Sequence, residues 1–186
     1  MGFEDETWFS RFERPSLHSW AEAGRPTRLL EKKAAKDDPE PKALACYGMY
    51  LPGIGETWLR FVDGRPVSAI TTQFLSWCCE KLQRRGKKAL LLIWDNASWH
   101  KSHEVREWIN AHNREVKASG QGVRIVPCLL PTKSPWLNAI EPQWIHGKRK
   151  VVQPERLLGA YELADRVCGA FDCIHEPHLS IPQEVA

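Results

Sequence analysis

The chain has 186 residues, 42% of them hydrophobic and 26% charged, which is typical of one soluble globular domain and too short for two full domains. No stretch is long and apolar enough to cross a bilayer, so we expect no membrane contact, and six cysteines without a secretory segment favour a reducing cytoplasm over a disulfide framework. The net charge of +3 is only mildly basic, but two local basic runs, 84–88 and 148–150, could contact phosphate or be solvated helix ends.

The first elements expected along the chain are strands. Residues 1–12 mix aromatic and acidic side chains and are predicted to form a strand, and 31–42 form an exposed polar connection. Residues 43–51 and 56–62 follow as two further strands, separated by the turn signal Pro52-Gly53. The first third of the chain therefore predicts a meander of strands.

Helices and strands alternate in the rest of the chain. Apolar residues at helical spacing predict a helix that Thr71 or Thr72 caps and Gly86 ends. The same spacing predicts helices over 103–116 and 155–171. Two short apolar runs, 89–94 and 123–130, are predicted as strands, and the loop 131–135 leads into a further helix that begins near Glu141. This order predicts an α/β protein.

Three separated acids are the candidates for chemistry. Asp95 closes the apolar run 89–94, Glu141 lies where a loop enters a helix, and Asp5 lies in the first strand. Cleavage or transfer at a phosphodiester can be assisted by two magnesium ions roughly 3.5–4 Å apart, and magnesium prefers hard oxygen ligands. The three carboxylates could hold two such ions if the two strands are neighbours and the start of the helix lies beside them.

Each acid also has a structural interpretation that stays open. Asp5 could belong to a solvated acidic cluster, and Asp95 could be a turn residue at the end of a strand. Glu141 could form a capping box with Asn138 and merely hydrogen-bond the start of the helix. Pro142 favours the first helical position, which would place Glu141 just before the helix and leave its side chain free to face a metal.

Residues near these acids could support them. Lys148 lies seven positions after Glu141 on the same helical face and could meet phosphate beside the metals. His100 could hydrogen-bond a phosphate oxygen or a ligand, or be an exposed structural histidine. Three tryptophans could stack on bases or belong to the core: Trp99, Trp136 and Trp144.

The tail contains four residues that can bind zinc. They are Cys168, Cys173, His175 and His178, and they lack the paired spacing of common zinc modules. The alternative is that the two cysteines are buried and the two histidines lie on the surface. The sequence leaves both interpretations open.

Two motifs carry a resemblance to a known family. Residues 90–100 read LLLIWDNASWH, and residues 130–144 read LPTKSPWLNAIEPQW. Their order, together with FEDETWF over 3–9, closely resembles the catalytic domain of DDE superfamily endonucleases, in particular mariner-related bacterial insertion-sequence transposases. The interval between Asp95 and Glu141 is longer than in that family, and we assign the surplus to a surface extension over 113–122.

The resemblance implies a fold and a set of site residues. The fold is ribonuclease-H-like, with a mixed central sheet flanked by helices over residues 1–152, and residues 153–186 form a C-terminal helix and tail packed on it. The catalytic, metal-binding acids are Asp5, Asp95 and Glu141, which hold two Mg²⁺ ions, with Mn²⁺ able to substitute. The N-terminal DNA-binding domain that such transposases normally carry is expected to be absent.

The resemblance also implies a function and partners. The expected function is metal-dependent cleavage and strand transfer at transposon ends, in which water attack frees a 3′-hydroxyl. The expected partners are double-stranded DNA of the transposon ends and target, bound by a homodimer in a nucleoid-associated cytoplasmic location. Expected DNA contacts are Asn96, His100, Lys148, Arg149 and Lys150. Two alternatives stay open: a catalytically inactive DNA-binding or dimer-forming transposase remnant, and a ribonuclease-H-like nuclease outside transposition.

Overall fold

A mixed six-stranded sheet forms the centre of the molecule. The computed structural model describes residues 1–12, 16–17, 29–30, 35–151 and 156–181. The strand order is β7-β6-β1-β4-β5-β8, and β2 and β3 form a separate two-stranded sheet. The strands are β1 (Gly2–Ser10), β2 (Ser16–Leu17), β3 (Leu29–Leu30), β4 (Ala43–Leu51), β5 (Glu56–Asp63), β6 (Ala89–Trp94), β7 (Arg124–Leu129) and β8 (Leu179–Ser180).

Antiparallel and parallel pairings meet at β1. On one side, β1, β4 and β5 form the predicted antiparallel meander. On the other side, β6 lies parallel to β1, and β7 lies parallel to β6. At the far edge, β8 adds to β5 in parallel.

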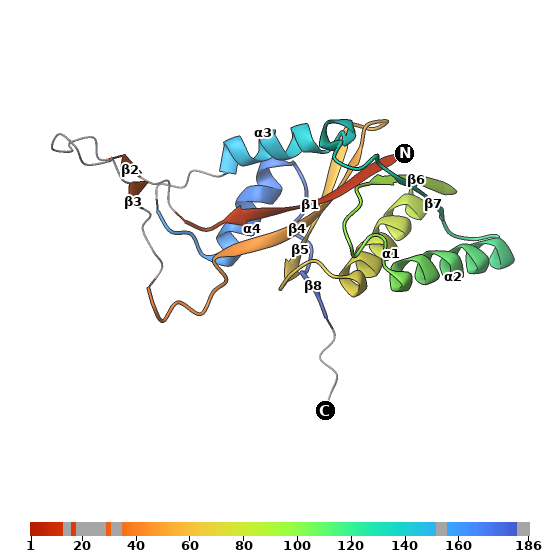
Figure 1. Cartoon of the computed structure of the whole chain (residues 1–186), viewed down its shortest axis with the longest axis horizontal. Helices are drawn as coiled ribbons and strands as arrows, with labels where there is room; N and C mark the ends of the chain where they lie inside the picture. The colour runs from red at the N-terminus through yellow and green to blue at the C-terminus, as the bar shows by residue number, and fades with distance from the viewer. Residues whose placement is uncertain (13–15, 18–28, 31–34, 152–155, 182–186) are drawn as a thin grey trace, which may run out of the picture.

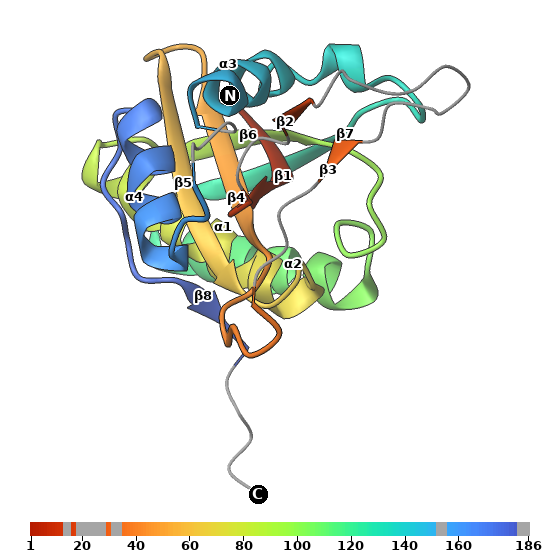
Figure 2. The same cartoon turned by 90° about the vertical axis from the view of Figure 1, so that its left-hand side faces the viewer.

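Helices cover both faces of this sheet. They are α1 (Ser68–Arg84), α2 (His103–Ser119), α3 (Glu141–Val151) and α4 (Ala160–Ala170), with a short 3₁₀ turn, η1 (Pro135–Leu137), before α3. Figures 1 and 2 show α1 and α2 on one face and α3 and α4 on the other. The predicted α/β architecture with a mixed central sheet between helices is therefore confirmed.

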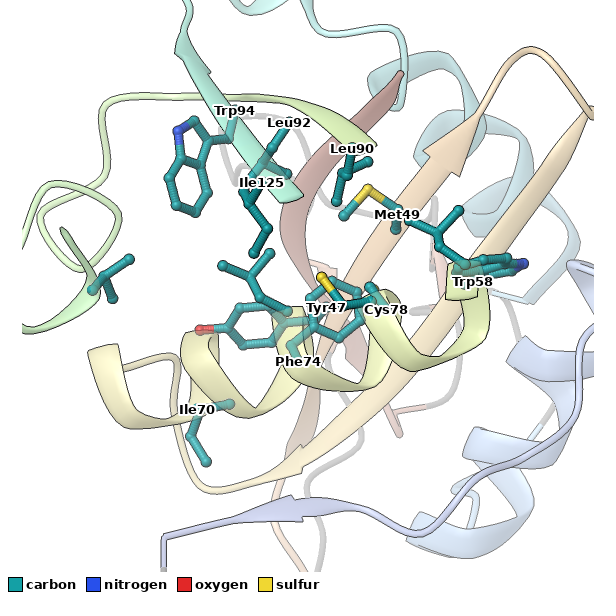
Figure 3. Packing of buried hydrophobic residues seen from close by; sticks show 14 of the residues in the cluster. Tyr47, Met49, Trp58, Ile70, Phe74, Cys78, Leu90, Leu92, Trp94 and Ile125 are labelled. Carbon is teal, nitrogen blue, oxygen red and sulfur yellow. The ribbon is translucent and has the colours of Figure 1, made fainter. Parts of the chain in front are cut away.

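The sheet separates two hydrophobic cores. Alternate side chains of β4 point to opposite faces, so Tyr47 and Met49 pack toward α1 while Leu44 and Cys46 pack toward α3 and α4. Figure 3 shows Tyr47 and Met49 with their neighbours from α1, β5, β6 and β7. The near-continuous burial of β4 follows from this position between two layers of helices.

The start of α1 differs from the prediction. The helix begins at Ser68, and Val67 precedes it without a side-chain cap. Thr71 is buried inside the helix, where its hydroxyl lies 2.9 Å from that of Tyr47, so a tertiary contact uses the group that was expected to cap the helix. The predicted end is correct, because Gly86 adopts a φ of 71° just past the helix.

The segment 113–122 lies on the surface as predicted, but most of it is helix and not loop. Helix α2 continues to Ser119 and ends at Gly120, which has a left-handed φ of 68°. Asn113 exchanges two hydrogen bonds with the backbone of Ile125, at 2.7 and 2.8 Å. These bonds tie the extended helix to β7, so the additional residues lengthen an ordered element instead of a loop.

The expected layout of the C-terminal region can be followed in part. Residues 152–155 and 182–186 lie outside the described residues, as do 31–34 of the expected polar connection. Helix α4 packs against α3 and β4, and β8 extends the main sheet. Among the described helices, none has the length and apolar character needed to cross a bilayer.

Candidate active site

The sheet register brings the first two acids to the same place. Gly2 pairs with Leu92 and Phe3 with Ile93 in the parallel β1–β6 pair. Asp5 and Asp95 each lie two residues beyond the Phe3–Ile93 pair. The two parallel strands therefore bring these acids side by side at the end of β6. Helix α3 begins with Glu141. Asp5, Asp95 and Glu141 together line one cavity of about 330 Å³.

Asp5 is held by a tryptophan from α3. Trp144 is buried, and its Nε1 donates a hydrogen bond to Asp5 Oδ2 at 3.1 Å. Asp5 is paired across the sheet with Gly48, and a Cβ atom at Gly48 would lie only 2.3 Å from the Trp144 ring. The missing side chain at Gly48 is therefore what lets the indole reach the carboxylate.

We expect Gly48→Ala to lower the free energy of unfolding by about 1–3 kcal/mol, because the added methyl group displaces the buried Trp144 ring. Chemical denaturation measures this loss. Gly53→Ala is the matched control, since Gly53 is exposed and a Cβ there meets nothing within 4 Å. Equal stability of the two variants would contradict the proposed packing of Trp144 over Gly48.

The capping-box interpretation of Glu141 is not supported. Such a box requires the side-chain oxygen of Asn138 to accept a hydrogen bond from the Glu141 backbone N–H. Asn138 Oδ1 accepts no hydrogen bond from the described residues, and its amide nitrogen donates to the Glu4 carbonyl at 3.3 Å. The helix starts at Glu141, one residue earlier than expected from Pro142, and the Glu141 side chain lines the cavity.

The cavity acids differ in their protonation. Burial, followed by the negative charges of Glu6 and Glu141, raises the pKa of Asp5 to about 7. A hydrogen bond from His100 lowers the pKa of Asp95, and a bond of 2.8 Å from the Ala97 N–H acts in the same direction. The cavity therefore concentrates carboxylates whose repulsion a bound cation relieves.

His100 links Asp95 to two further acids behind the cavity. Its Nδ1 lies 2.9 Å from Asp95 Oδ1, while its Nε2 lies 3.1 Å from Glu6 Oε1 and 3.2 Å from Glu4 Oε2. Since both ring nitrogens face carboxylates, both carry a proton and the ring is an imidazolium. Burial alone lowers the pKa of His100, but the charge of Glu4 and the bonds to Asp95 and Glu6 outweigh it and raise the pKa to about 11.

Glu4 and Glu6 were not recognised as functional from the sequence. They share the face of β1 opposite to Asp5 because side chains alternate along a strand. Glu4 is completely buried, and Glu6 also accepts a hydrogen bond of 2.7 Å from Trp99 Nε1. The only sequence signal was two acids at alternate positions in a predicted strand.

The structure places two of the expected DNA contacts, His100 and Lys148, away from the lining of the acid cavity. His100 is buried with both nitrogens engaged, so it cannot bind phosphate directly. Lys148 lies in the last turn of α3, and a rise of 1.5 Å per residue puts it roughly 10 Å along the axis from Glu141. Lys148 would therefore have to extend back along α3 to meet a phosphate beside the acids, and this contact stays a prediction.

The other expected contacts keep accessible positions. Asn96 lines the cavity, and its amide nitrogen donates to the Leu130 carbonyl at 2.5 Å, which joins the loops after β6 and β7. Arg149 and Lys150 are exposed in the last turn of α3. Of the three tryptophans, Trp144 is buried and Trp136 is 76% exposed on η1.

The four zinc-capable residues of the tail do not form one site. Within the described part of the chain, the single group of three or more potential ligands whose atoms lie within 4.8 Å of one another is Glu4, Glu6 and His100. Cys168 is buried, and Cys173 is partly buried. The two cysteines and the two histidines of the tail therefore do not all bind one ion.

A mixed sheet between helices, with acids from β1, the end of β6 and the start of α3 lining one cavity, defines a ribonuclease-H-like domain with a carboxylate site. The family model of the DDE superfamily endonucleases matches residues 1–162, and the chain belongs to this family. The family expected from the two motifs is thus confirmed. No curated protein matches the sequence.

Solved transposase structures share the fold. The Mos1 transposase paired-end complex with left transposon end matches with a TM-score of 0.63 at 16% identity, covering 93% of this chain and 48% of that one. A pre-cleavage Mos1 transpososome gives 0.63 at 14% identity, covering 94% and 48%. The Mos1 strand transfer complex gives 0.54 at 16% identity, covering 93% and 47%. The chain thus spans about half the length of these solved chains, and the predicted ribonuclease-H-like fold is confirmed.

Proposed function

We propose that this chain is the catalytic domain of a transposase that cleaves DNA at transposon ends and transfers the freed strand, using divalent metal ions. The observation that carries the proposal is the single cavity lined by Asp5, Asp95 and Glu141 in a DDE-family chain. The matched Mos1 structures include complexes with a transposon end and a strand transfer complex, which supports DNA ends as the substrate class.

The cavity suits hard divalent cations. Three carboxylates are the oxygen donors that magnesium prefers, and burial together with the negative charges of Glu6 and Glu141 raises the pKa of Asp5, which a bound cation would offset. The ligand oxygens of Asp5, Asp95 and Glu141 do not all lie within 4.8 Å of one another in the described structure, and the number of ions, two, is part of the proposal. Two of the matched Mos1 structures are complexes with Mn and with Mg.

Bound ions supply a deprotonated water nucleophile and stabilise the leaving oxygen of the phosphodiester. The protein's own residues place the ligands. Asp5 and Asp95 come from neighbouring strands and Glu141 from α3, Trp144 orients Asp5, and His100 orients Asp95. Asp5 and Asp95 are thus held by hydrogen bonds before substrate arrives, which is the preorganisation that catalysis needs.

The rim of the cavity offers contacts for DNA. Lys133 lines the cavity and can pair with a phosphate beside the acids, in addition to the contact expected from Lys148. Trp136 follows three residues later and presents its exposed ring for base stacking. Arg149 and Lys150 can hold the backbone further along the duplex. A homodimer on double-stranded DNA is part of this proposal.

A nicking and joining assay tests the function. The chain is incubated with supercoiled plasmid and a duplex with a free 3′-hydroxyl end, in Mg²⁺, Mn²⁺, Ca²⁺ or EDTA. We expect nicking and end joining with Mg²⁺ or Mn²⁺, and neither with Ca²⁺ or EDTA. Duplex binding with no nicking in any metal would contradict the proposal and favour the inactive remnant, whereas nicking without joining would favour a nuclease outside transposition.

A further inference from the structure

Two histidines meet at the edge of the sheet, away from the acid cavity. His175 and His178 lie between α4 and β8, and their Nε2 atoms are 3.2 Å apart. The other nitrogen of each ring faces a carboxylate: His175 Nδ1 is 2.6 Å from Asp165 Oδ1, and His178 Nδ1 is 2.7 Å from Asp63 Oδ1. Phe61 packs against both rings.

The carboxylates determine what the facing nitrogens present. An aspartate at Nδ1 keeps the proton on that nitrogen and leaves a lone pair on Nε2. With both rings in this form, two lone pairs face each other across 3.2 Å, between two negatively charged aspartates. The two lone pairs repel each other unless a shared proton or a metal ion lies between the two nitrogens.

We propose that His175 and His178 bind a divalent transition-metal ion, with Zn²⁺ the best fit, through their Nε2 atoms. Two nitrogens at about 2.0–2.1 Å from a tetrahedral zinc lie roughly 3.3 Å apart. The observed separation of 3.2 Å is close to that value. A ligating histidine whose other nitrogen donates to a carboxylate is the usual arrangement around zinc.

The remaining ligands are water molecules. The described residues offer no third ligand atom close to both Nε2 atoms, and the side chains of His175 and His178 remain 12% and 21% exposed. Asp63 and Asp165 balance the charge of a divalent ion. Imidazole nitrogen selects zinc, copper or nickel over magnesium, so this site and the carboxylate cavity take different metals.

The ion would join three parts of the fold. Asp63 ends β5, Asp165 lies on α4, and His178 directly precedes β8, whose Leu179 pairs with Val62 of β5. The site is therefore structural: it fastens the C-terminal segment to the sheet and to the helix that packs on α3. It is independent of the function proposed for the acid cavity.

Calorimetric titration of the full chain with Zn²⁺ tests the site, in millimolar Mg²⁺ to occupy the carboxylates. All proteins carry Cys128→Ser, because Cys128 is an exposed free cysteine and a thiolate is a zinc ligand that would compete with the histidines. We expect one Zn²⁺ per chain, at least tenfold weaker binding in His175→Gln and His178→Gln, and unchanged binding in His103→Gln, an exposed histidine on α2. Asp63→Asn and Asp165→Asn should weaken binding about 10- to 100-fold.

A second readout identifies the ligands. Cu²⁺ bound in place of Zn²⁺ should give an electron paramagnetic resonance spectrum with coupling to two imidazole nitrogens, and His178→Gln should reduce it to one. Zinc affinity that is the same in His175→Gln, His178→Gln and the parent would overturn the proposal, and the pair would then share a proton. If either histidine variant fails to fold, the surface variant Asp165→Asn replaces it in the test. A zinc affinity of Asp165→Asn equal to that of the parent would then overturn the proposal.

Discussion

Replacing Asp95 with asparagine is expected to lower metal-dependent DNA nicking by roughly a thousandfold while the chain stays folded. The change removes one negative charge and one hard oxygen ligand from the cavity. A metal ion that stabilises charge in the transition state contributes several kcal/mol, and a loss of about 4 kcal/mol lowers the rate a thousandfold. The cost to the fold is small, because the Asp95 side chain is 52% exposed and an amide oxygen can still accept the bond from His100.

Asp37→Asn provides the matched control for this change, since Asp37 is an exposed aspartate in the connection before β4. Both variants should show the circular dichroism and melting temperature of the parent. A plasmid-nicking time course in Mn²⁺ then compares their rates. If Asp95→Asn nicks DNA at the same rate as Asp37→Asn, Asp95 is not part of the catalytic site. That conclusion holds even if the parent chain is an active nuclease.

Asp95 and Glu141 could be proposed from the local sequence pattern, whereas the assignment of Asp5 depended on the family resemblance. Asp95 ends an apolar run of strand length, and Glu141 lies at a loop-to-helix junction marked by Pro142. Their meeting place depends on β1 lying beside β6, which the family resemblance supplied and periodicity alone did not. The β1–β6 register then places Asp5 and Asp95 side by side without further adjustment.

The features that sequence missed all depend on partners far along the chain. Glu4 and Glu6 meet His100 more than ninety positions away, at separations of 3.2 and 3.1 Å. Thr71 is buried within α1 because its hydroxyl forms a hydrogen bond with the hydroxyl of Tyr47 from β4. Asn113 continues α2 because the backbone of Ile125 accepts and donates its hydrogen bonds. Local helix and strand propensity cannot predict such contacts, and tertiary packing overrides that propensity.

His100→Gln is expected to lower the free energy of unfolding at neutral pH by about 3–5 kcal/mol, the usual effect of removing one partner of a buried ion pair. The imidazolium is the cation that the described structure places among Glu4, Glu6 and Asp95. Glutamine can bond to only part of this group and carries no charge. Because Asp95 also loses its partner, nicking should fall together with stability.

The pH dependence identifies charge as the cause. Since the folded chain raises the pKa of His100 from 6.5 to about 11, its contribution is fully present below the unfolded value and is lost as pH rises through the folded one. Burial raises the pKa of Glu4, so without the imidazolium Glu4 takes up a proton as pH falls and the buried charge disappears. The His100 contribution to the difference in unfolding free energy between parent and His100→Gln is therefore largest at pH 5 and declines above about pH 6.5. The Glu4 contribution grows as pH rises, so the difference should change between pH 5 and pH 8.

Adding Glu4→Gln to His100→Gln should restore part of the lost stability, because it removes the most buried of the uncompensated carboxylates. Urea denaturation of both single variants and the double variant at pH 5 and pH 8 gives the coupling energy, with His103→Gln as a control for loss of an exposed histidine. An equal loss at both pH values, with no recovery in the double variant, would show that His100 acts through its packing on Trp94 and not through its charge.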